Sequence, residues 1–508
     1  MSSINRDSYA DLNVYYGDLH NHCNISYGHG SLEAAFRNAR LQLDFASVTV
    51  HGAWPDLPSN DPQLAYLIDY HHRGFEQAQR QWPEYLAQTE RENCDGEFVT
   101  FPSFEWHSCK YGDHCIYFKN AGDHRILADE DLETLRRTLR TFDTPALVLP
   151  HHIGYRQGYR GINWDAFSPE MSPVAEIFSF HGLAESSEGS YPYLHSMGPR
   201  HQLSTAQHGW ARGLVFGLVG STDHHNAFPG SYGYGRLGIW APALTRDALW
   251  QAIQQRRTYV LTGDRIELAF GINDQIMGDL GPAAQERWID VGVRGGGSID
   301  YVEVLHNNQI IHRESVFPQR QQAGTFKVHV ELGWGERDEP TVWDVDLAVR
   351  QGTLRTVEPR FRGYGPTASP GETANFSPSH LTRPAPDRVQ FQTQTMQNLS
   401  LHTPATEGIC VEIEGDSETT LIARFNGQQQ EIRLAELIDG SRTFYLGGFV
   451  SPAICFHRAI PLQEFAMNMA FMHDGGLRER DWYYVRVRQR NDQWAWSSPI
   501  WIGEPAST

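Results

Sequence analysis

Histidines and acidic residues recur at the ends of short apolar runs in the first 225 residues. Five separate runs, 14–19, 46–50, 98–104, 147–150 and 218–222, are each followed or ended by such a side chain. Neutral imidazoles combined with carboxylates are ligands that suit Zn, Mn or Fe, and they need no thiolate. The side chains in question are His20, His22, His51, Glu105, His151, Asp223 and His225.

The spacing of these residues along the chain indicates which side chains point to the same side. Side chains two apart on an extended segment share one face, so His20 pairs with His22 and Asp223 pairs with His225, while His224 is directed elsewhere. Seventeen of the 24 histidines lie at or before His225, which is a further reason to expect metal. Such ions act as Lewis acids and lower the pKa of a bound water, giving a hydroxide nucleophile near neutral pH.

The elements that must position these residues alternate between strand-like and helix-like segments from residue 14 to about 260. The predicted strands include Phe45–Val50, Phe98–Phe101, Ala146–Leu149, Val174–Phe180 and Leu214–Val219, and the predicted helices are Ser31–Leu43, with Ser31 as N-cap, 63–90, 130–140 and 246–257. Alternation of this kind predicts a mostly parallel sheet, either a barrel or doubly wound. The C-terminal ends of parallel strands meet on one face, where active sites form.

After about residue 265 the pattern changes to strands separated by Gly, Asn and Asp turns, which predicts an all-β unit of the sandwich kind. Residues 363–388 are rich in Pro, Ser, Thr and Gly and are expected to form a long loop or insertion. Four tryptophans of this region could bind sugars, although packing in the core explains them more simply. They are Trp343, Trp482, Trp494 and Trp496.

Composition restricts the class of protein. The 508 residues are 40% hydrophobic and 20% charged, as in globular chains, and the net charge of -19 argues against a nucleic-acid binder. A small anionic substrate stays compatible, because bound metal ions reverse the local field. We expect no membrane segment. The N-terminus has no apolar core of the kind a signal peptide needs, and the six cysteines form no CxxC pair. We therefore expect a cytoplasmic protein with free thiols.

The motifs resemble those of the PHP superfamily, named for polymerase and histidinol phosphatase domains. The resembling stretches are Gly17–His22, Ser47–His51, Phe104–Trp106 with His114, Pro150–His152 and Gly220–His225, together with Leu244–Leu249, Arg256–Tyr259, Asp481–Gln489 and Ser497–Trp501 of one large branch. The resemblance implies a distorted (β/α)7 barrel at residues 10–265, followed by a β-rich domain at residues 266–508. It also implies two or three divalent metal ions, Zn, Mn or Fe.

By position, the resemblance assigns metal-ligand roles to His20, His22, His51, Glu105, His114, His151, Asp223 and His225. Glu105 would bridge two metals, and Asp223 would lie near the attacking water. Two positions depart from the family pattern. Tyr27 stands where many members have an acidic metal ligand, and His29 could substitute for that ligand. Val50 stands where the family usually has an Asp before the strand-end histidine.

Other residues near these motifs allow two interpretations. His151 is preferred over His152 as the ligand. A polar Glu176 inside an apolar strand is costly unless it faces the pocket, so we weigh a catalytic role for it with His181. Arg156 and Arg160 could clamp an anion or could be solvated loop residues. Histidines without a strand-end position, His107 among them, are expected to be structural.

The resulting prediction is a metal-dependent hydrolase with catalytic roles for Glu105, Asp223, His181, Glu176 and Arg156. The resemblance to PHP proteins, whose characterised members are mostly phosphoesterases, favours phosphoester cleavage. One alternative is a hydrolase of amides, lactones or other carbon esters on the same metals. A second is a non-catalytic binding protein in which the metal site is structural. One scaffold hosts many reactions, so the substrate does not follow from the fold.

Overall fold

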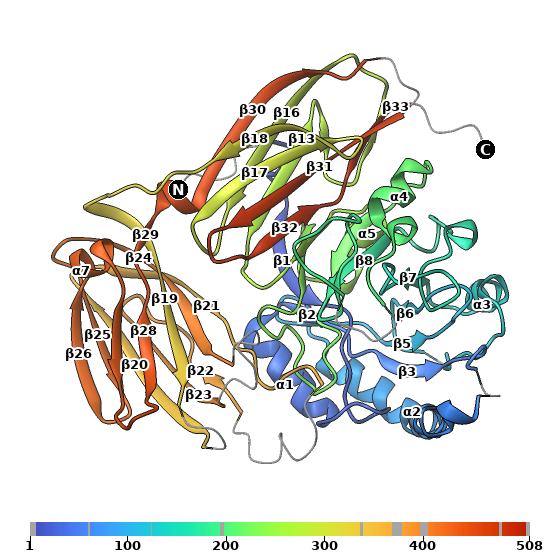
Figure 1. Ribbon diagram of the computed structural model, residues 1–508, viewed down its shortest axis with the longest axis horizontal. Coiled ribbons are helices and arrows are strands. Elements are labelled where there is room, and N and C mark those ends of the chain that lie inside the picture. Colours follow the sequence, from blue (N-terminus) through green and yellow to red (C-terminus); the bar gives the residue numbers. More distant parts are fainter. Residues whose placement is uncertain are drawn as a thin grey trace.

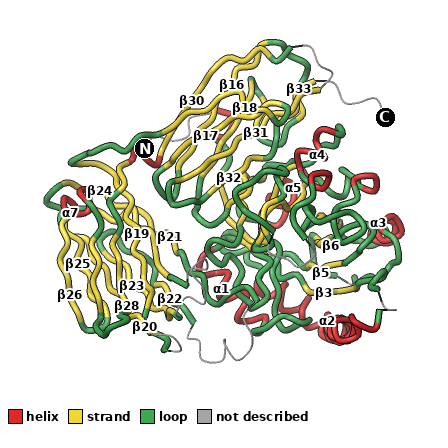
Figure 2. Tube along the Cα trace, viewed as in Figure 1, coloured by secondary structure: helices red, strands yellow, loops and turns green. Residues whose placement is uncertain are grey.

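The computed structural model describes residues 7–58, 61–122, 124–193, 198–335, 339–367, 378–396, 405–476 and 480–503. Figure 1 shows an N-terminal part at the lower right, a group of strands above it and a second group of strands at the left. Most of the helical segments gather in the N-terminal part (Figure 2). The protein is therefore a mixed α/β structure followed by a β-rich one, as the sequence pattern predicts.

The N-terminal part alternates strands with helices. Its strands are β1 (Asn13–Asp18), β2 (Phe45–Ala46), β3 (Val50–Ala53), β4 (Val99–Thr100), β5 (Ser103–Trp106), β6 (His114–Phe118), β7 (Ala146–Pro150), β8 (Val174–Ser179), β9 (Gly182–Leu183), β10 (Gly217–Gly220), β11 (Arg236–Ala241) and β12 (Thr258–Leu261). Its helices are α1 (Leu32–Gln42), α2 (Ala65–Glu92), α3 (Leu132–Leu139), α4 (Ala206–Ala211) and α5 (Arg246–Gln254), with short 3-10 turns η1 (Asp7–Tyr9), η2 (Pro62–Leu64), η3 (Trp164–Ala166) and η4 (Gln202–Ser204).

Helix α1 shows how local sequence fixes an element. The Ser31 side chain accepts a hydrogen bond from the Ala34 backbone N–H at 3.2 Å, which satisfies one free donor of the first turn. Leu32, Ala35, Phe36 and Ala39 are buried, since their spacing places them on one face. The predicted cap and the predicted buried face of this helix are confirmed.

The strands do not all run parallel. β1, β2 and β4 are parallel neighbours, as are β3 with β5 and β8 with β10. However, β6 is antiparallel to both β5 and β7, and β11 is antiparallel to both β1 and β12. Only residues 107–113 separate β5 from β6, and a parallel connection needs about a dozen residues or more. These pairings give three sheets, so a closed (β/α)7 barrel is not shown.

The strands after residue 265 form two units with separate apolar cores. The first, called here the terminal β unit, contains β13 (Glu267–Ile272), β14 (Gln275–Ile276), β15 (Leu280–Gly281), β16 (Glu286–Arg294), β17 (Ile299–His306), β18 (Gln309–Ser315), β30 (Ala466–Asp474), β31 (Arg480–Gln489), β32 (Trp494–Ser497) and β33 (Ile500–Gly503). Strand β32 pairs with β12, which joins this unit to the N-terminal part in one continuous sheet. The C-terminal motifs of the sequence thus hold the two parts together.

The second unit lies between β18 and β30 in the chain, and we call it the inserted β unit (residues 323–461). It contains β19 (Ala323–Trp334), β20 (Thr341–Arg350), β21 (Thr353–Pro359), β22 (His380–Leu381), β23 (Arg388–Thr395), β24 (Glu407–Asp416), β25 (Thr420–Phe425), β26 (Gln428–Arg433), α7 (Leu434–Asp439), β27 (Arg442–Tyr445), β28 (Pro452–Phe456) and β29 (Ile460–Pro461), and α8 (Leu462–Phe465) follows it. Its two sheets share one core.

Alternating burial explains the inserted β unit. Along β20, for example, Trp343, Val345 and Leu347 are buried while the residues between them are exposed or half-buried. The Trp343 indole donates to Thr395 Oγ1 at 2.7 Å, and its side chain is in the core rather than in a sugar site. Part of the predicted loop at 363–388 lies outside the described residues.

Two further observations concern the whole chain. All six cysteines are free thiols. Among the described residues, no helix is both long and apolar enough to cross a membrane.

Candidate metal centre

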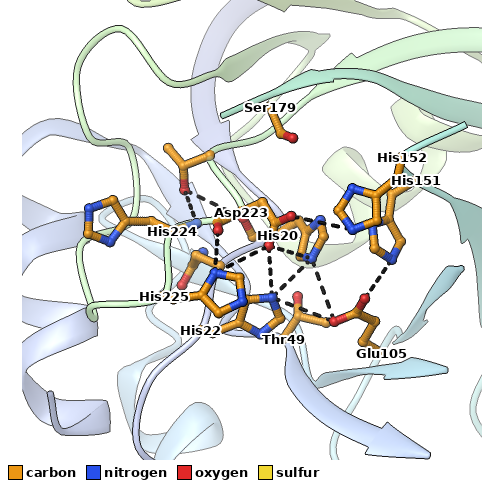
Figure 3. A network of polar contacts seen from close by, with 12 residues as sticks. His20, His22, Thr49, Glu105, His151, His152, Ser179, Asp223, His224 and His225 are labelled. Atoms are coloured by element: carbon orange, nitrogen blue, oxygen red, sulfur yellow. Dashed lines mark hydrogen bonds and ion pairs between the residues drawn. The ribbon is translucent and has the colours of Figure 1, made fainter. Parts of the chain in front are cut away.

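The segment that carries His20 and His22 lies directly beside the segment that carries Asp223. The His22 backbone N–H donates to the His224 carbonyl at 2.7 Å, and the Asp223 N–H donates to the His20 carbonyl at 2.7 Å. As a result the Nε2 atoms of His20 and His22 lie 3.2 Å apart. They lie 3.3 and 3.0 Å from Asp223 Oδ1, respectively (Figure 3).

Asp18, the last residue of β1, fastens these two segments. Its carboxylate accepts hydrogen bonds from the backbone N–H groups of His20 at 3.1 Å, Thr222 at 3.1 Å and Gly230 at 2.8 Å, and from the Thr222 hydroxyl at 2.5 Å. Burial raises the pKa of Asp18 to about 6, and these hydrogen bonds limit the rise. A buried acid outside the metal-facing group therefore aligns both pairs of candidate ligands.

Glu105 lies at the centre of the group, at the end of β5. Its Oε1 atom is 2.9 Å from His151 Nε2 and 3.2 Å from His107 Nδ1. Its Oε2 atom is 3.4 Å from His51 Nε2 and 3.6 Å from His22 Nε2. The two oxygens thus face two different sets of imidazoles, which is the arrangement that a bridging carboxylate requires.

His51 and His225 join the group through His22. The His22 ring stacks on His51 with centroids 3.7 Å apart and lies 4.5 Å from the His225 ring. Nitrogens of these three residues lie within 4.8 Å of one another. The Ser26 hydroxyl lies 2.9 Å from His51 Nδ1 and orients the His51 ring.

Tyr27 and His29 take up different positions. The Tyr27 ring stacks on His51 at 3.6 Å, and its hydroxyl is 3.3 Å from His107 Nε2. His29 contributes its backbone N–H, which donates to the His225 carbonyl at 2.7 Å. An aromatic ring therefore covers His51 where many PHP proteins have an acid.

Both histidines after β7 reach the group. His151 approaches Glu105, whereas His152 Nε2 is 3.6 Å from Asp223 Oδ2 and its ring lies 4.3 Å from that of His181. His152 has a positive φ of 46°, and its ring centroid lies 4.0 Å from that of His151 at an interplanar angle of 58°. The sequence interpretation preferred His151 over His152 as the metal ligand; in the structure His151 faces Glu105 and His152 faces Asp223.

Glu176 and His181 contact two different candidate ligands, His20 and Asp223. Glu176 Oε2 is 3.1 Å from His20 Nδ1, so it fixes the His20 ring through the nitrogen that does not face Asp223. His181 Nε2 is 3.0 Å from Asp223 Oδ2, and its Nδ1 is 3.0 Å from the Tyr155 hydroxyl. With Asp223 ionised, Nε2 carries the proton and Nδ1 accepts one from Tyr155.

His114 and Arg156 do not join the group, in contrast to the expectation for both. In the β5–β6 register, Glu105 faces Cys115 and Trp106 faces His114. Neighbouring residues of a strand point to opposite faces, so His114 points away from Glu105, and its Nδ1 lies 2.9 Å from the Gly112 carbonyl.

Arg156 is exposed and stacks on Tyr159, with its guanidinium 3.8 Å from the ring centroid. The arginine that reaches the site is Arg160. Its Nε atom donates to Asp113 Oδ2 at 2.7 Å, and it also approaches His107 Nδ1 at 3.3 Å. Its charge is thus paired with a carboxylate.

The sequence interpretation missed three members of this region: His107, Cys115 and Asp113. The spacing rule that pairs His20 with His22 also pairs Glu105 with His107, so that signal was present. The position of Cys115 and Asp113 depends on the antiparallel turn between β5 and β6, which a parallel-sheet interpretation does not produce.

The inserted β unit closes one side of the centre. The His225 N–H donates to the Pro366 carbonyl at 2.9 Å, Asn226 Nδ2 donates to Gly365 O at 2.7 Å, and His224 Nε2 lies 3.1 Å from Tyr364 O. His224 therefore points away from the other imidazoles, as predicted (Figure 3).

A cavity of about 150 Å³ lies where this loop meets α1. Its walls include His29, Arg37, Asn226 and Tyr364. Burial raises the pKa of Tyr364 to about 12, so its hydroxyl stays protonated at neutral pH. The cavity therefore combines one cation, a phenol and an amide beside the His225 backbone.

Electrostatics set the protonation states. Burial disfavours charge on Glu105 and Asp223, but imidazoles, His107 foremost for Glu105 and His20 foremost for Asp223, hold both pKa values well below the usual range. Burial lowers the pKa of His22, and burial with His22 nearby lowers that of His51 well below its usual value. Burial also lowers the pKa of His20, but the Asp223 carboxylate and its other neighbours more than offset this effect. The pKa of His20 therefore lies well above its usual value. Ionised acids and neutral imidazoles are the forms that bind metal, so Glu105, Asp223, His22 and His51 are in the binding form, whereas His20 holds a proton that a bound cation would displace.

The donor set fits divalent cations. Groups of buried imidazole and carboxylate atoms within 4.8 Å of one another include His20 with His22 and Asp223, and His51 with Glu105 and His107. Two imidazole nitrogens 3.2 Å apart, both facing a carboxylate oxygen, satisfy one another poorly unless a proton or a cation lies between them. Nitrogen and oxygen donors of this kind suit Zn, Mn or Fe.

Comparisons with known proteins give distant matches, and no family profile matches the chain. Proteins of Chlamydia trachomatis and Chlamydia muridarum, each described only as uncharacterized, are 30% and 28% identical over 169 residues, 30% of this chain. One from Chlamydia pneumoniae is 26% identical over 240 residues, 43% of this chain. The matched regions span 27 to 38% of the length of these relatives.

Among solved structures, a two-domain protein containing a predicted PHP-like metal-dependent phosphoesterase, from Bacteroides vulgatus, aligns with 91% of this chain and 96% of its own. The sequence identity is 12% and the TM-score is 0.30.

Proposed function

We propose that this chain is a metal-dependent hydrolase that cleaves phosphoesters of small anionic substrates. The observation that carries the proposal is the position of Glu105, whose two carboxylate oxygens each approach two imidazoles from separate segments of the chain. A carboxylate shared between two sets of nitrogen donors is what a centre with two cations needs.

We infer two or three divalent ions, Zn, Mn or Fe. His20, His22, Asp223 and Glu105 would hold one ion, and Glu105 with His107 and His151 would hold a second. A third would need His51 and His225, where Tyr27 offers no carboxylate. When bound, such ions supply Lewis acidity, which polarises a phosphoryl oxygen and makes water more acidic.

The remaining residues act on protons and orientation. His181 lies on the outer side of Asp223, with an 11% exposed side chain, so it can meet both the carboxylate and a substrate. We assign to His181 the donation of a proton to the leaving group. Tyr155 positions His181 by donating to Nδ1. Glu176 orients His20 and does not touch the substrate.

Neither arginine is assigned the role of a phosphate clamp. Arg156 is exposed beside Tyr159, and the charge of Arg160 is paired with buried Asp113. Arg37 lines the cavity and can meet an anionic substrate, and Asn226 Oδ1 there is a buried acceptor without a hydrogen-bond partner among the described residues. We therefore propose that the cavity receives the part of the substrate that carries a further polar or anionic group.

The fold proposal follows the same lines. We propose that residues 10–265 form a distorted barrel of the PHP kind, with β1, β2, β4 and the pairs β3–β5 and β8–β10 as its parallel parts. Support comes from the convergence of the strand ends at the candidate ligands.

The test is a substrate panel. Purified full-length protein, loaded in turn with Mn²⁺ and Zn²⁺, is assayed on phosphomonoesters, phosphodiesters, carboxylic esters, lactones and amides. We expect turnover of phosphoesters, lost on chelation and restored by metal. Turnover of only the carbon-centred substrates would contradict phosphoesterase activity, and turnover of none with metal retained would favour a structural metal site.

A further inference from the structure

Cys115 lies on the side of β6 that faces the candidate metal centre. It is 1% exposed and directly opposite Glu105 in the antiparallel register of β5 and β6. Directly opposite residues of antiparallel strands point to the same face, so the thiol and the central carboxylate share a side. The thiol sulfur, a nitrogen of His20 and a nitrogen of His151 all lie within 4.8 Å of one another.

The environment of His151 gives a second, independent observation. The His151 ring is 1% exposed, and its Nδ1 atom makes no hydrogen bond with any residue that the structure describes. A buried polar atom without a partner is rare in native proteins, and an absent ion is one of its explanations. His151 belongs to the three-residue group that contains the thiol.

We propose that β6 contributes the Cys115 thiolate to the metal centre, in a site with His20 and His151 that selects a soft cation, Zn²⁺ or Fe²⁺, over Mn²⁺ or Mg²⁺. This proposal rests on the proposed metal-dependent function and refines it, because His20 and His151, assigned above to two different ions, would share the ion that Cys115 binds. Thiolate and imidazole together favour zinc and iron, whereas hard cations prefer oxygen donors. The thiol releases its proton to solvent when the cation binds.

Distances permit the site. Zinc binds sulfur at about 2.3 Å and imidazole nitrogen at about 2.0–2.1 Å. Three atoms within 4.8 Å of one another can all meet one ion after shifts of less than about 1 Å each. Three protein ligands leave one position of a tetrahedral ion open, which is the pattern of catalytic rather than structural zinc.

The chain offers a matched control next to Cys115. His114 is buried on the same strand, but its side chain points to the opposite face and its Nδ1 lies beside the Gly112 carbonyl. Cys115→Ser and His114→Gln therefore alter neighbouring buried positions, and only the first changes the face toward Glu105. Cys115→Ala serves as a second variant in case the serine is poorly tolerated.

The experiment uses full-length protein stripped with a chelator and loaded with Co²⁺. We expect a sulfur-to-cobalt charge-transfer band in the near ultraviolet for wild type and His114→Gln, and loss of that band in Cys115→Ser and Cys115→Ala. In the zinc-loaded wild type, X-ray absorption should show a sulfur neighbour at about 2.3 Å.

Two results would overturn the proposal in different ways. Cobalt bound with visible d–d bands but no charge-transfer band, and zinc with only nitrogen and oxygen neighbours, would remove Cys115 and leave the metal centre intact. No binding of cobalt or zinc to the wild type would remove both the thiolate ligand and the proposed function.

Discussion

Glu176 and His20 form a buried pair in which the carboxylate sits behind the imidazole: Glu176 Oε2 is 3.1 Å from His20 Nδ1, and His20 Nε2 faces Asp223 Oδ1 at 3.3 Å. A carboxylate in this position fixes the ring and makes the other nitrogen a better metal ligand. The sequence suggested that Glu176 faces the pocket, and the structure gives it a positioning role.

Removing this support should weaken metal binding. We expect Glu176→Ala to lower metal affinity by roughly 10–100-fold, and Glu176→Gln to recover part of it because the amide can still accept a hydrogen bond from Nδ1. Competition with a metallochromic chelator measures the affinity. Wild-type affinity in Glu176→Ala would show that Glu176 does not orient His20.

His107 is expected to be a functional residue, although the sequence interpretation assigned it a structural role. Because its Nδ1 lies 3.2 Å from Glu105 Oε1, we expect His107→Gln to lower metal affinity by at least roughly tenfold. His72→Gln is the control, since His72 is exposed on α2. Equal metal affinity in the two variants would show that His107 is not a metal ligand and has only a structural role.

Substitutions of His181 and Tyr155 should lower the turnover rate and leave the metal content unchanged. If His181 donates a proton to the leaving group, His181→Ala should lower kcat by roughly 10²–10⁴-fold with metal content unchanged. Tyr155→Phe should show a smaller loss, because the Tyr155 hydroxyl acts only through His181 Nδ1. A kcat of His181→Ala close to that of wild type would exclude this role.

Glu407 should make the stability of the protein depend on pH. Its buried carboxylate accepts the N–H groups of Arg362 and Gly363 at 2.8 Å each, and burial raises its pKa from 4.5 to about 8. The folded state therefore holds a proton that the unfolded chain has lost, so stability is fully present below pH 4.5 and declines as the pH rises through about 8.

We expect Glu407→Gln to remove this decline, which is on the order of a few kcal/mol. Urea unfolding of both proteins at about pH 5 and about pH 9 measures the effect. The difference between the two proteins should be larger at high pH, with Glu407→Gln the more stable there. A parallel dependence on pH in wild type and Glu407→Gln would contradict the shifted pKa.

Much of the N-terminal part could be predicted from the sequence. The spacing of Leu32, Ala35, Phe36 and Ala39 gave the buried face of α1, and Ser31 gave its cap. The position of His20, His51, Glu105, His151 and Asp223 after apolar runs was sufficient to predict that they meet, because strand ends converge in such sheets.

What could not be predicted depends on strand direction. The turn at 107–113 reverses the chain, so β6 runs antiparallel to β5. In the resulting register Cys115, and not His114, shares a face with Glu105. Periodicity of apolar residues reports burial but not direction, and β5 and β6 are buried on both faces, so they show no alternation to indicate how each strand runs. The contacts of Pro366 with His225 join residues 141 positions apart, which no local pattern encodes.

The central claim is that imidazoles and acids from distant segments bind cations together, and metal content measures it most directly. Elemental analysis of purified wild type, His22→Ala and Asp223→Ala should give two or three divalent ions per chain in wild type and clearly fewer in each variant. Wild type without bound metal after loading, or unchanged metal content in both variants, would contradict the account.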